Sequence, residues 1–327
     1  MKKLHPVGID VSAKELVVAS DRHREARFDN DPADHKKLIR VLTKGGRGAR
    51  VVLEATGVYS LDLAFALHRS ARIEVMVANP RAVANFAKAY LQRSKTDPLD
   101  ATVLLEFARR MPFTRWVPPA PEHLDFRALS RRIAALVKIL QQEKNRLHAA
   151  SQSIEITALV REDVEGNIGH LAERIERLRD QALAAIGNHE PLREAFEHLI
   201  SIKGIADASA ISILGELVVL PADMTVRQWV AHAGLDPRHV KSGTSIHKPA
   251  RISKAGNKYL RAALYMPALV AIQHEPNVAA FYDKLVARGK TKMQAIIAVM
   301  RKLLHAIFGM LKHGADFDGR KFHAINA

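Results

Sequence analysis

The stretch "HPVGIDVSAKELVVASD", residues 5–21, decides the fold class of the N-terminal part of the chain. Two runs rich in valine, isoleucine and leucine flank a polar segment at Ser12–Lys14, which predicts two short strands joined by a turn. The segment "REARFDN" (24–30) offers a third strand. The chain therefore begins with a sheet.

Helical and strand patterns alternate through residue 80. A capping aspartate opens "DPADHKKLIRVLTKGG" (31–46), which reads as a helix ending in two glycines. The strand-like "ARVVLEATG" (49–57), the amphipathic helix "YSLDLAFALHRSA" (59–71) and the strand-like "RIEVMVANP" (72–80) follow. Strands that alternate with helices predict an α/β layer in which helices pack on a sheet.

The rest of the chain reads as helical. A proline-rich connector, "PFTRWVPPAPE" (112–122), precedes long helical patterns up to about residue 189, which predict a coiled-coil arm or a helical linker packed on its neighbours. The segment "LISIKGIADASAISILGEL" (199–217) has the form helix, glycine-containing turn, helix. We predict three parts: an α/β domain over residues 1–111, a linker with coiled-coil helices over 112–194, and a mostly helical domain over 195–327.

Composition narrows the protein class. The chain has 327 residues, 48% of them hydrophobic, which suffices for ordinary folded cores. It has no cysteine, which excludes disulfides and thiolate zinc sites and fits a reducing cytoplasm. The N-terminus lacks the apolar run of a signal peptide, and no uninterrupted apolar run reaches the roughly 20 residues of a membrane span. We expect a cytoplasmic protein without a membrane partner.

The charge indicates a polyanionic partner. The net charge of +16 divides into +7 for residues 1–110, zero for residues 111–195 and +9 for residues 196–327. Two basic ends around a neutral middle predict two surfaces that meet nucleic acid. A charge excess that only aids solubility is the alternative.

Four carboxylates are candidates for a metal site. Asp10 lies within an apolar strand-like run, where an aspartate is unfavourable unless it has a partner, and Glu54 ends another such run. Asp97 and Asp100 in "SKTDPLDA" fall on one face of one helical turn, although helix capping explains both equally well. Oxygen ligands of this kind suit Mg²⁺ or Mn²⁺, and such ions support phosphoryl transfer.

The segment "HVKSGTSIHK" (239–248) contains three hydroxyl side chains around one glycine, at Ser242, Thr244 and Ser245. It is either a polar turn or the position of a nucleophile. No acidic residue occurs from 238 to 261, so the segment could bind backbone phosphates or be a solvated basic surface. Its basic residues are Arg238, Lys241, Lys248, Arg251, Lys254, Lys258 and Arg261, and further candidates near the acids are Arg81, Lys88, Arg93 and Lys95.

Several motifs in order resemble one protein family. They are "GIDVSAKEL" (8–16), "LEATGVY" (53–59), "NPRAVANFAKAYLQRSKTDPLDA" (79–101), "SIKGIADASAISILGEL" (201–217), "AHAGLDPRHVKSGTSIHKPARISKAGNKYLRAALYMPAL" (231–269) and "MRKLL" (300–304). The chain resembles the insertion-sequence 110 family of bacterial transposases, whose N-terminal domain is of the DEDD type and which includes pilin-gene-inverting recombinases.

The resemblance implies more than the patterns do. It implies an N-terminal fold similar to ribonuclease H and the resolvase RuvC, with Asp10, Glu54, Asp97 and Asp100 as its metal-binding acids, and Ser242 as the nucleophile. It further implies a noncoding bridge RNA that pairs with target and donor DNA, and dimers that assemble into a tetramer. In that assembly the acids of one protomer act with the serine of another.

Three alternatives stay open. The chain could be a RuvC-like nuclease that cuts branched DNA without using the serine, or a non-catalytic nucleic-acid-binding protein whose acids are caps and strand ends. A recombinase that needs no RNA is the third.

Overall fold

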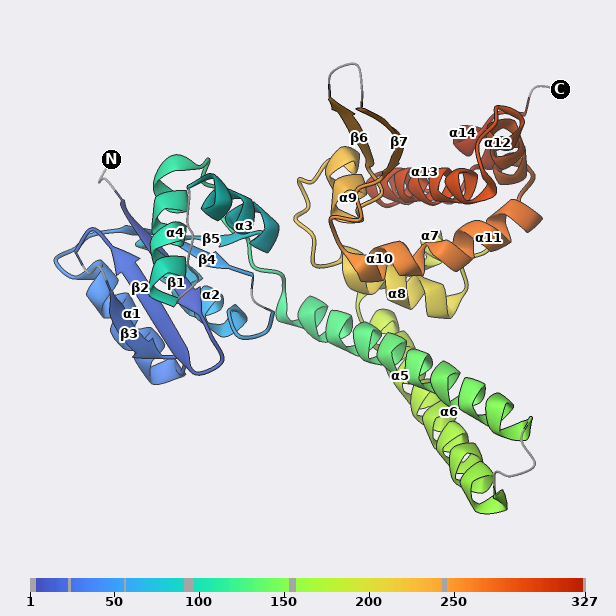
Figure 1. Ribbon diagram of the computed structural model, residues 1–327, viewed down its shortest axis with the longest axis horizontal. Helices are drawn as coiled ribbons and strands as arrows, with labels where there is room; N and C mark the ends of the chain where they lie inside the picture. Colours follow the sequence, from blue (N-terminus) through green and yellow to red (C-terminus); the bar gives the residue numbers. More distant parts are fainter. Residues whose placement is uncertain are drawn as a thin grey trace. The chain divides into compact units, whose positions relative to one another are not determined.

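The computed structural model describes residues 4–22, 25–55, 57–90, 97–152, 157–242 and 246–325. The chain divides into two compact units, an N-terminal unit of residues 1–118 and a C-terminal unit of residues 119–327 (Figure 1). The predicted division at residues 111 and 194 stays a prediction.

The N-terminal unit contains the predicted sheet, and its pairing is mixed. Its described strands are β1 (His5–Val11), β2 (Glu15–Ser20), β3 (Ala26–Asp29), β4 (Ala49–Glu54) and β5 (Ile73–Ala78), in the order β3-β2-β1-β4-β5. The first three strands form an antiparallel meander, whereas β1, β4 and β5 run parallel. The parallel pairs are connected through helices, as parallel pairing requires.

Helices cover both faces of this sheet. The described helices of the unit are α1 (Pro32–Thr43), α2 (Leu61–His68), α3 (Pro80–Ala89) and α4 (Asp97–Arg110). Odd-numbered residues of β1, such as Val7 and Ile9, pack in one core with Leu38 of α1 and Leu63 of α2. Because side chains alternate along a strand, the even-numbered residues of β1 point to the opposite face. There Val52 packs with residues of α3 and α4.

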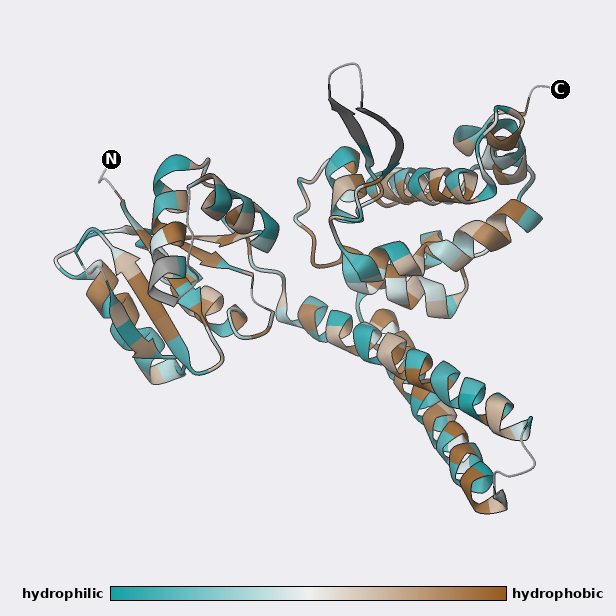
Figure 2. Ribbon diagram, in the orientation of Figure 1, coloured by the Kyte–Doolittle hydropathy of each residue, from teal (hydrophilic) through white to brown (hydrophobic). Residues whose placement is uncertain are grey.

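The C-terminal unit begins with two long helices, α5 (Pro121–Ser151) and α6 (Ala158–Gly187). They run back along each other (Figure 1), and Ile133 and Leu171 are among the apolar residues they bury. Figure 2 shows that hydrophobic and hydrophilic residues alternate along both helices, which is the amphipathic pattern of helices that pack along one stripe. Figure 2 also shows a largely hydrophobic β2 in the N-terminal unit.

The remaining elements of this unit are mostly helices around one core. They are α7 (Glu190–Ile200), α8 (Asp207–Leu217), α9 (Val226–His232), β6 (Pro237–Ser242), β7 (Ile246–Ile252), α10 (Lys258–Ala263), α11 (Tyr265–His274), α12 (Pro276–Ala287), α13 (Lys292–His313) and α14 (Gly319–Phe322). The α/β start and the mostly helical remainder confirm the predicted fold class at this level.

Helix α13 is the one helix in the described part of the chain whose length and composition would suit a membrane span. Its residues Val299, Leu303 and Ile307 are fully buried and pack in the core of the unit with residues of α7, α9 and α11. A central helix of a folded domain meets the same criteria of length and composition, and these contacts identify α13 as such a helix.

Strands β6 and β7 were not predicted. They form an antiparallel hairpin, with the register shifting between Arg238 and Val240. Pro249 of β7 lies within this irregularity, between Lys248 and Arg251, and bulges are where a strand accommodates proline. The polar sequence of β7 and its proline favour a loop. Pairing with β6 overrides this local preference and makes the segment a strand.

Candidate functional site

Two of the predicted acids lie side by side at one edge of the sheet. Strands β1 and β4 are parallel with Ile9 opposite Leu53, so Asp10 and Glu54 occupy the next positions of adjacent strands. Neighbouring strands are about 4.8 Å apart. Both acids share the sheet face of Gly8 and Val52 by the two-residue period, and this is the face that α4 covers.

The direction of α4 brings Asp100 to the same edge. An ion pair joins Arg109, at the end of α4, to Asp21, which follows β2. Because Ser20 of β2 pairs with Val7 near the start of β1, the C-terminus of α4 lies at the start of β1. The N-terminus of α4 therefore lies at the carboxyl end of β1 and β4. We call the acids of this edge, Asp10, Glu54 and Asp100, the carboxylate edge.

Gly8 sets how closely α4 lies on the sheet. A Cβ atom at this position would be 2.2 Å from the backbone nitrogen of Leu105 and 2.3 Å from the carbonyl oxygen of Ala101. No side chain fits in this space, so the backbone of α4 rests directly on β1. Glycine has a packing reason here: it sets the height of Asp100 above Asp10.

The fourth acid, Asp97, is the first residue of α4, but its side chain lies outside the described residues. Within the described part of the chain, no three histidine or carboxylate side chains form a group that could hold a metal ion. The carboxylate edge nevertheless has the donors that suit Mg²⁺, which are hard oxygens on three separate elements. The metal site stays a prediction.

The basic residues predicted near the acids are only partly described. Arg81 and Lys88 have exposed side chains on α3, whereas Arg93 and Lys95 lie outside the described residues. Helix α3 is fixed to α4 by Phe86, whose ring meets the ring of Phe107 at 5.3 Å. Two of the four cations therefore project from a helix that packs on the helix bearing Asp100.

The predicted nucleophile, Ser242, is the last residue of β6 and pairs with Ile246 across the hairpin. Thr244 and Ser245 lie outside the described residues, and so do the side chains of residues 239–242 and 246–250. The structure thus assigns a backbone position to Ser242: the distal end of a two-stranded hairpin. Its reactivity stays a prediction.

The end of the hairpin that joins the helices, formed by residues 236–237 and 252–253, is called its root here. Several hydrogen bonds hold this root in place. Ser253 donates its hydroxyl to Asp236 Oδ1 at 2.5 Å and its backbone N–H to the carbonyl of the same residue at 2.8 Å. Arg261 donates from Nη1 to the carbonyl of Ala233 at 2.8 Å. Lys254 has a φ of 51°, in the left-handed region that favours glycine, and its N–H donates to the carbonyl of Gly234.

The predicted basic run from 238 to 261 divides by environment. Arg238, Arg251, Lys254 and Lys258 are exposed, whereas Lys241 and Lys248 have side chains outside the described residues. Arg261 is half-buried, and its guanidinium holds the root of the hairpin as described above. A structural role therefore accounts for Arg261, and its predicted contact with nucleic acid stays a prediction.

A buried polar network lies behind the hairpin, and sequence reasoning missed it. The carboxylate of Glu216, on α8 and only 2% exposed, accepts two hydrogen bonds from Arg131 of α5 at 2.7 and 2.8 Å. Asn257, which caps α10, donates to the same carboxylate at 2.5 Å and lies 3.3 Å from Nε2 of His232. The Arg131 guanidinium also covers the ring of Tyr259 at 4.5 Å. The network joins α5, α8, α9 and α10.

Burial and charge in this network lower the pKa values of Glu216 and His232. Burial raises the pKa of the Glu216 carboxyl, but the hydrogen bonds from Arg131 and Asn257 outweigh it and hold that pKa below its ordinary value. Burial lowers the pKa of His232, against the opposing effect of Glu216. Both groups stay in their neutral-pH forms, an ionised carboxylate and a neutral imidazole. The sequence signal was a glutamate within the apolar run "ISILGEL".

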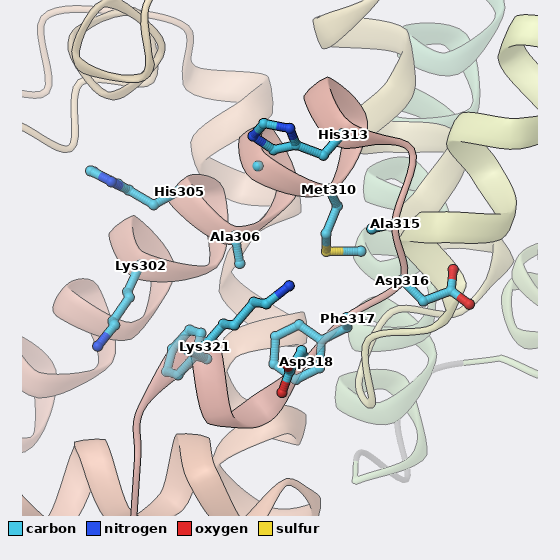
Figure 3. A pocket seen from close by; sticks show the side chains of 12 residues that line it. Lys302, His305, Ala306, Met310, His313, Ala315, Asp316, Phe317, Asp318 and Lys321 are labelled. Carbon is cyan, nitrogen blue, oxygen red and sulfur yellow. The ribbon is translucent and has the colours of Figure 1, made fainter.

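A cavity of about 310 Å³ lies between α13 and the segment that leads to α14 (Figure 3). None of the predicted site residues lines it. Lys302 at its edge lies 4.1 Å from the ring centre of Phe281 and 5.0 Å from that of Phe322. Burial and the nearby Lys284 lower the pKa of Lys302. These contacts attach α14 to α13.

The sequence is similar to those of known transposases and pilin gene-inverting proteins. Residues 7–155 match a transposase family model of the IS110 DEDD type, and residues 196–283 match the model described as "Transposase IS116/IS110/IS902 family". The pilin gene-inverting protein of Moraxella bovis is 31% identical over 322 residues, which cover 96% of this chain and 98% of that protein. The pilin gene-inverting protein of Moraxella lacunata is 32% identical over 276 residues, covering 83% and 82% of the two chains.

A shorter match has the same character. An insertion element IS110 protein of 43.6 kDa from Streptomyces coelicolor is 30% identical over 122 residues, covering 37% of this chain and 30% of that protein. The two family models together include every acid of the carboxylate edge, Asp97 and Ser242.

Proposed function

The chain belongs to the IS110 family of transposases and thus to a group of enzymes that act on DNA, and from this premise we propose a mechanism of recombination through Ser242. The observation that carries the proposal is the carboxylate edge, where the ends of β1 and β4 meet the N-terminus of α4. Asp10, Glu54, Asp97 and Asp100 bind Mg²⁺, or Mn²⁺, at this edge. In the rest of the mechanism, the acids of this edge act together with Ser242, which belongs to the other compact unit of the chain.

The covalent step conserves a phosphate ester. The Oγ atom of Ser242 attacks a scissile phosphorus, so that a P–Oγ bond forms and one P–O bond of the DNA backbone breaks. The departing strand end becomes a hydroxyl and takes up the proton that the serine releases. Attack by another strand end reverses these steps, so rejoining requires no energy-rich cofactor. A metal ion held by Asp10, Glu54, Asp97 and Asp100 would supply polarisation of the scissile phosphate and stabilisation of charge on the departing oxygen.

The residues of the chain do the positioning. Gly8 lets the first turn of α4 come down beside Asp10 and Glu54, and the positive end of the helix partly offsets the repulsion among the acids. The hydrogen bonds of Asp236, Ser253 and Arg261 hold the root of the hairpin, so that the hairpin presents Ser242 from a fixed base.

The fold and the assembly complete the proposal. The mixed sheet is ribonuclease H-like and RuvC-like, and its strand order supports this; α5 and α6 form a coiled-coil arm. A bridge RNA pairs with target and donor DNA, so the protein itself needs little base specificity. Dimers assemble into a tetramer in which the acids of one protomer act on DNA held by the serine of another. The net charge of +16 supports binding to both nucleic acids in the cytoplasm.

A covalent adduct tests the chemistry. The protein is incubated with bridge RNA, target and donor DNA and Mg²⁺, denatured, and analysed for DNA bound to protein. We expect an adduct with the wild type and with Ser245→Ala, and none with Ser242→Ala or Asp10→Ala. An adduct that survives Ser242→Ala refutes the serine assignment. DNA cleavage without any adduct would instead identify a nuclease that hydrolyses its substrate.

A further inference from the structure

A groove of about 430 Å³ lies at the root of the β6–β7 hairpin, between the hairpin and helix α13. Pro237 of β6 and Ile252 of β7 line it from the hairpin, and Met293 and Ile297 line it from α13. It is as large as the pockets in which proteins bind small molecules or parts of a polymer. The groove lies wholly within the C-terminal unit.

The walls of the groove carry four cations. Arg251 and Lys254 come from the end of β7 and the turn after it, Lys290 precedes α13, and Arg301 lies in the third turn of α13. No carboxylate lines the groove, and among the described residues none of these four side chains forms an ion pair. Elsewhere in the unit arginines such as Arg131 and Arg193 are paired with glutamates.

This combination of charge and apolar floor defines the ligand chemistry. Four like charges around one space repel each other and favour an anion between them. Ile252, Met293 and Ile297 provide apolar surface beneath the charges, which suits the sugar or base that adjoins a phosphate. A nucleic-acid backbone offers both features, whereas a free inorganic anion would use only the cations.

The groove lies at a fixed distance along the hairpin from the proposed nucleophile. Pro237 and Ser242 are the two ends of β6, five residue steps apart. At about 3.3 Å per residue the strand spans roughly 17 Å. Successive phosphates of one strand in a duplex rise 3.4 Å, so a hairpin that lies along the duplex axis spans about five base pairs over this length.

Resting on the function proposed above, we propose that this groove binds the phosphodiester backbone of the DNA that Ser242 attacks, about five base pairs from the scissile phosphate. DNA is the occupant because the groove is built on the same two strands that carry the serine. The four cations bind the phosphate backbone. Because hydrogen bonds hold the root of the hairpin, this binding fixes where Ser242 lies along the DNA.

Salt-dependent binding tests the proposal. All proteins are full-length and carry Ser242→Ala, so no covalent step interferes, and the affinity for a 40-base-pair duplex is measured between 0.1 and 0.5 M salt. The groove variant combines Lys290→Gln with Arg301→Gln. The control combines Lys144→Gln with Arg177→Gln, which removes the same charge from exposed positions on α5 and α6.

The groove variant loses two phosphate contacts, which lowers the slope of log K against log salt by about 1.8. Binding at 0.1 M salt becomes about 60-fold weaker if the affinities converge at 1 M. The control keeps the slope of the parent. Hydroxyl-radical footprinting should show loss of protection about five base pairs from the cleavage site in the groove variant alone.

A folding defect is separated from a binding defect by Lys254→Gly. Glycine suits the φ of 51° at this position, so this variant keeps the turn while it removes a groove cation. It should lower the slope by about 0.9 with an unchanged thermal midpoint. Equal slopes for the parent, the groove variant and Lys254→Gly would overturn the proposal.

Two further results decide the occupant and the link to function. A loss of affinity for structured RNA with unchanged affinity for DNA would overturn the choice of DNA. Adduct formation by the Ser242-containing protein is measured in parallel. An adduct together with equal slopes refutes the groove alone, and a lowered slope without any adduct refutes the serine chemistry while the groove stands.

Discussion

Replacing Gly8 by alanine tests whether the contact between α4 and β1 sets the geometry of the carboxylate edge. The added Cβ would lie 2.2 Å from the nitrogen of Leu105 and 2.3 Å from the oxygen of Ala101. Carbon contacts are favourable from about 3.5 Å, so α4 has to move away from the sheet by about 1 Å or more. The opposing atoms are backbone atoms within a helix, so no side chain can rotate to relieve the clash.

The expected cost has two parts. Overpacking of this kind destabilises a domain by about 1–3 kcal/mol, and the backbone contact places Gly8→Ala at the upper end, near 3 kcal/mol. The same movement carries Asp100 away from Asp10 and Glu54 by about 1 Å. A misplacement of this size at reacting groups can slow catalysis by about 100-fold. We therefore expect a loss of activity that exceeds the unfolded fraction at 25 °C.

The stability assay uses tryptophan fluorescence during denaturant unfolding. The chain has two tryptophans, Trp116 in the N-terminal unit and Trp229 in the C-terminal unit. Trp116 packs against Phe65 at 5.3 Å, so a Trp229→Phe background reports the N-terminal unit alone. Adduct formation is measured on the same proteins below the unfolding transition.

Gly166→Ala is the control for the chemical change. It lies within α6, where a Cβ meets no atom within 4 Å, and should stabilise the C-terminal unit by about 1 kcal/mol, measured by Trp229 fluorescence in a Trp116→Phe background. Gly8→Ala with unfolding free energy within 0.5 kcal/mol of the parent would show that α4 does not rest on β1 as described. A destabilised protein with an unchanged adduct rate would show that the height of α4 is irrelevant to the site.

Two further predictions concern the network around Glu216. Arg131→Met leaves the buried carboxylate without its main partner and should destabilise the C-terminal unit by about 3 kcal/mol, the lower end of the range for buried pairs because the Arg131 side chain is 37% exposed, measured by Trp229 fluorescence; a loss below 1 kcal/mol would show that the Glu216 carboxylate is not buried in solution. The pKa of His232 is lowered on folding, so its contribution to stability is present above its ordinary value of 6.5 and is lost as the pH falls below it. The lowered pKa of Glu216 has the same sign and acts below its ordinary value of 4.5. Unfolding curves of the Trp116→Phe protein from pH 8 to pH 3 should show stability falling in both windows, and Glu216→Gln should remove only the lower one; stability that rises as the pH falls would contradict both shifts.

The spacing of apolar residues along the chain predicted the sheet, because the strands and helices of the N-terminal unit show the regular spacing that is typical of each. The same reading singled out Asp10 as an unfavourable acid within an apolar strand, and Asp10 lies on the face that α4 covers. The apolar pattern of β1 does not explain why position 8 is a glycine. A glycine in a strand reads as a weakness or a bulge, and only the backbone of α4, 93 to 97 residues further along the chain, explains it.

Features that depend on distant partners were missed. Glu216 obtains its partners from Arg131, 85 residues before it, and Asn257, 41 residues after it. The groove cation Arg301 belongs to the apolar helix α13, whose interior half is core, and Lys290 lies just before that helix. Neither set has a spacing that a local pattern can reveal, because the spacing is set by how helices pack.

The hairpin shows why a polar loop and an attacking element are compatible interpretations of "HVKSGTSIHK". The root is rigid, since Asp236, Ser253 and Arg261 fix it to the helices behind it. The distal end, by contrast, bears Ser242 on a two-stranded ribbon, and an isolated two-stranded ribbon is only marginally stable by itself. In the proposed mechanism the root fixes the position of the serine along the DNA, and the distal end presents the serine to the scissile phosphate. It follows that substitutions at the root should change which phosphate is attacked, whereas substitutions at the end should change how fast.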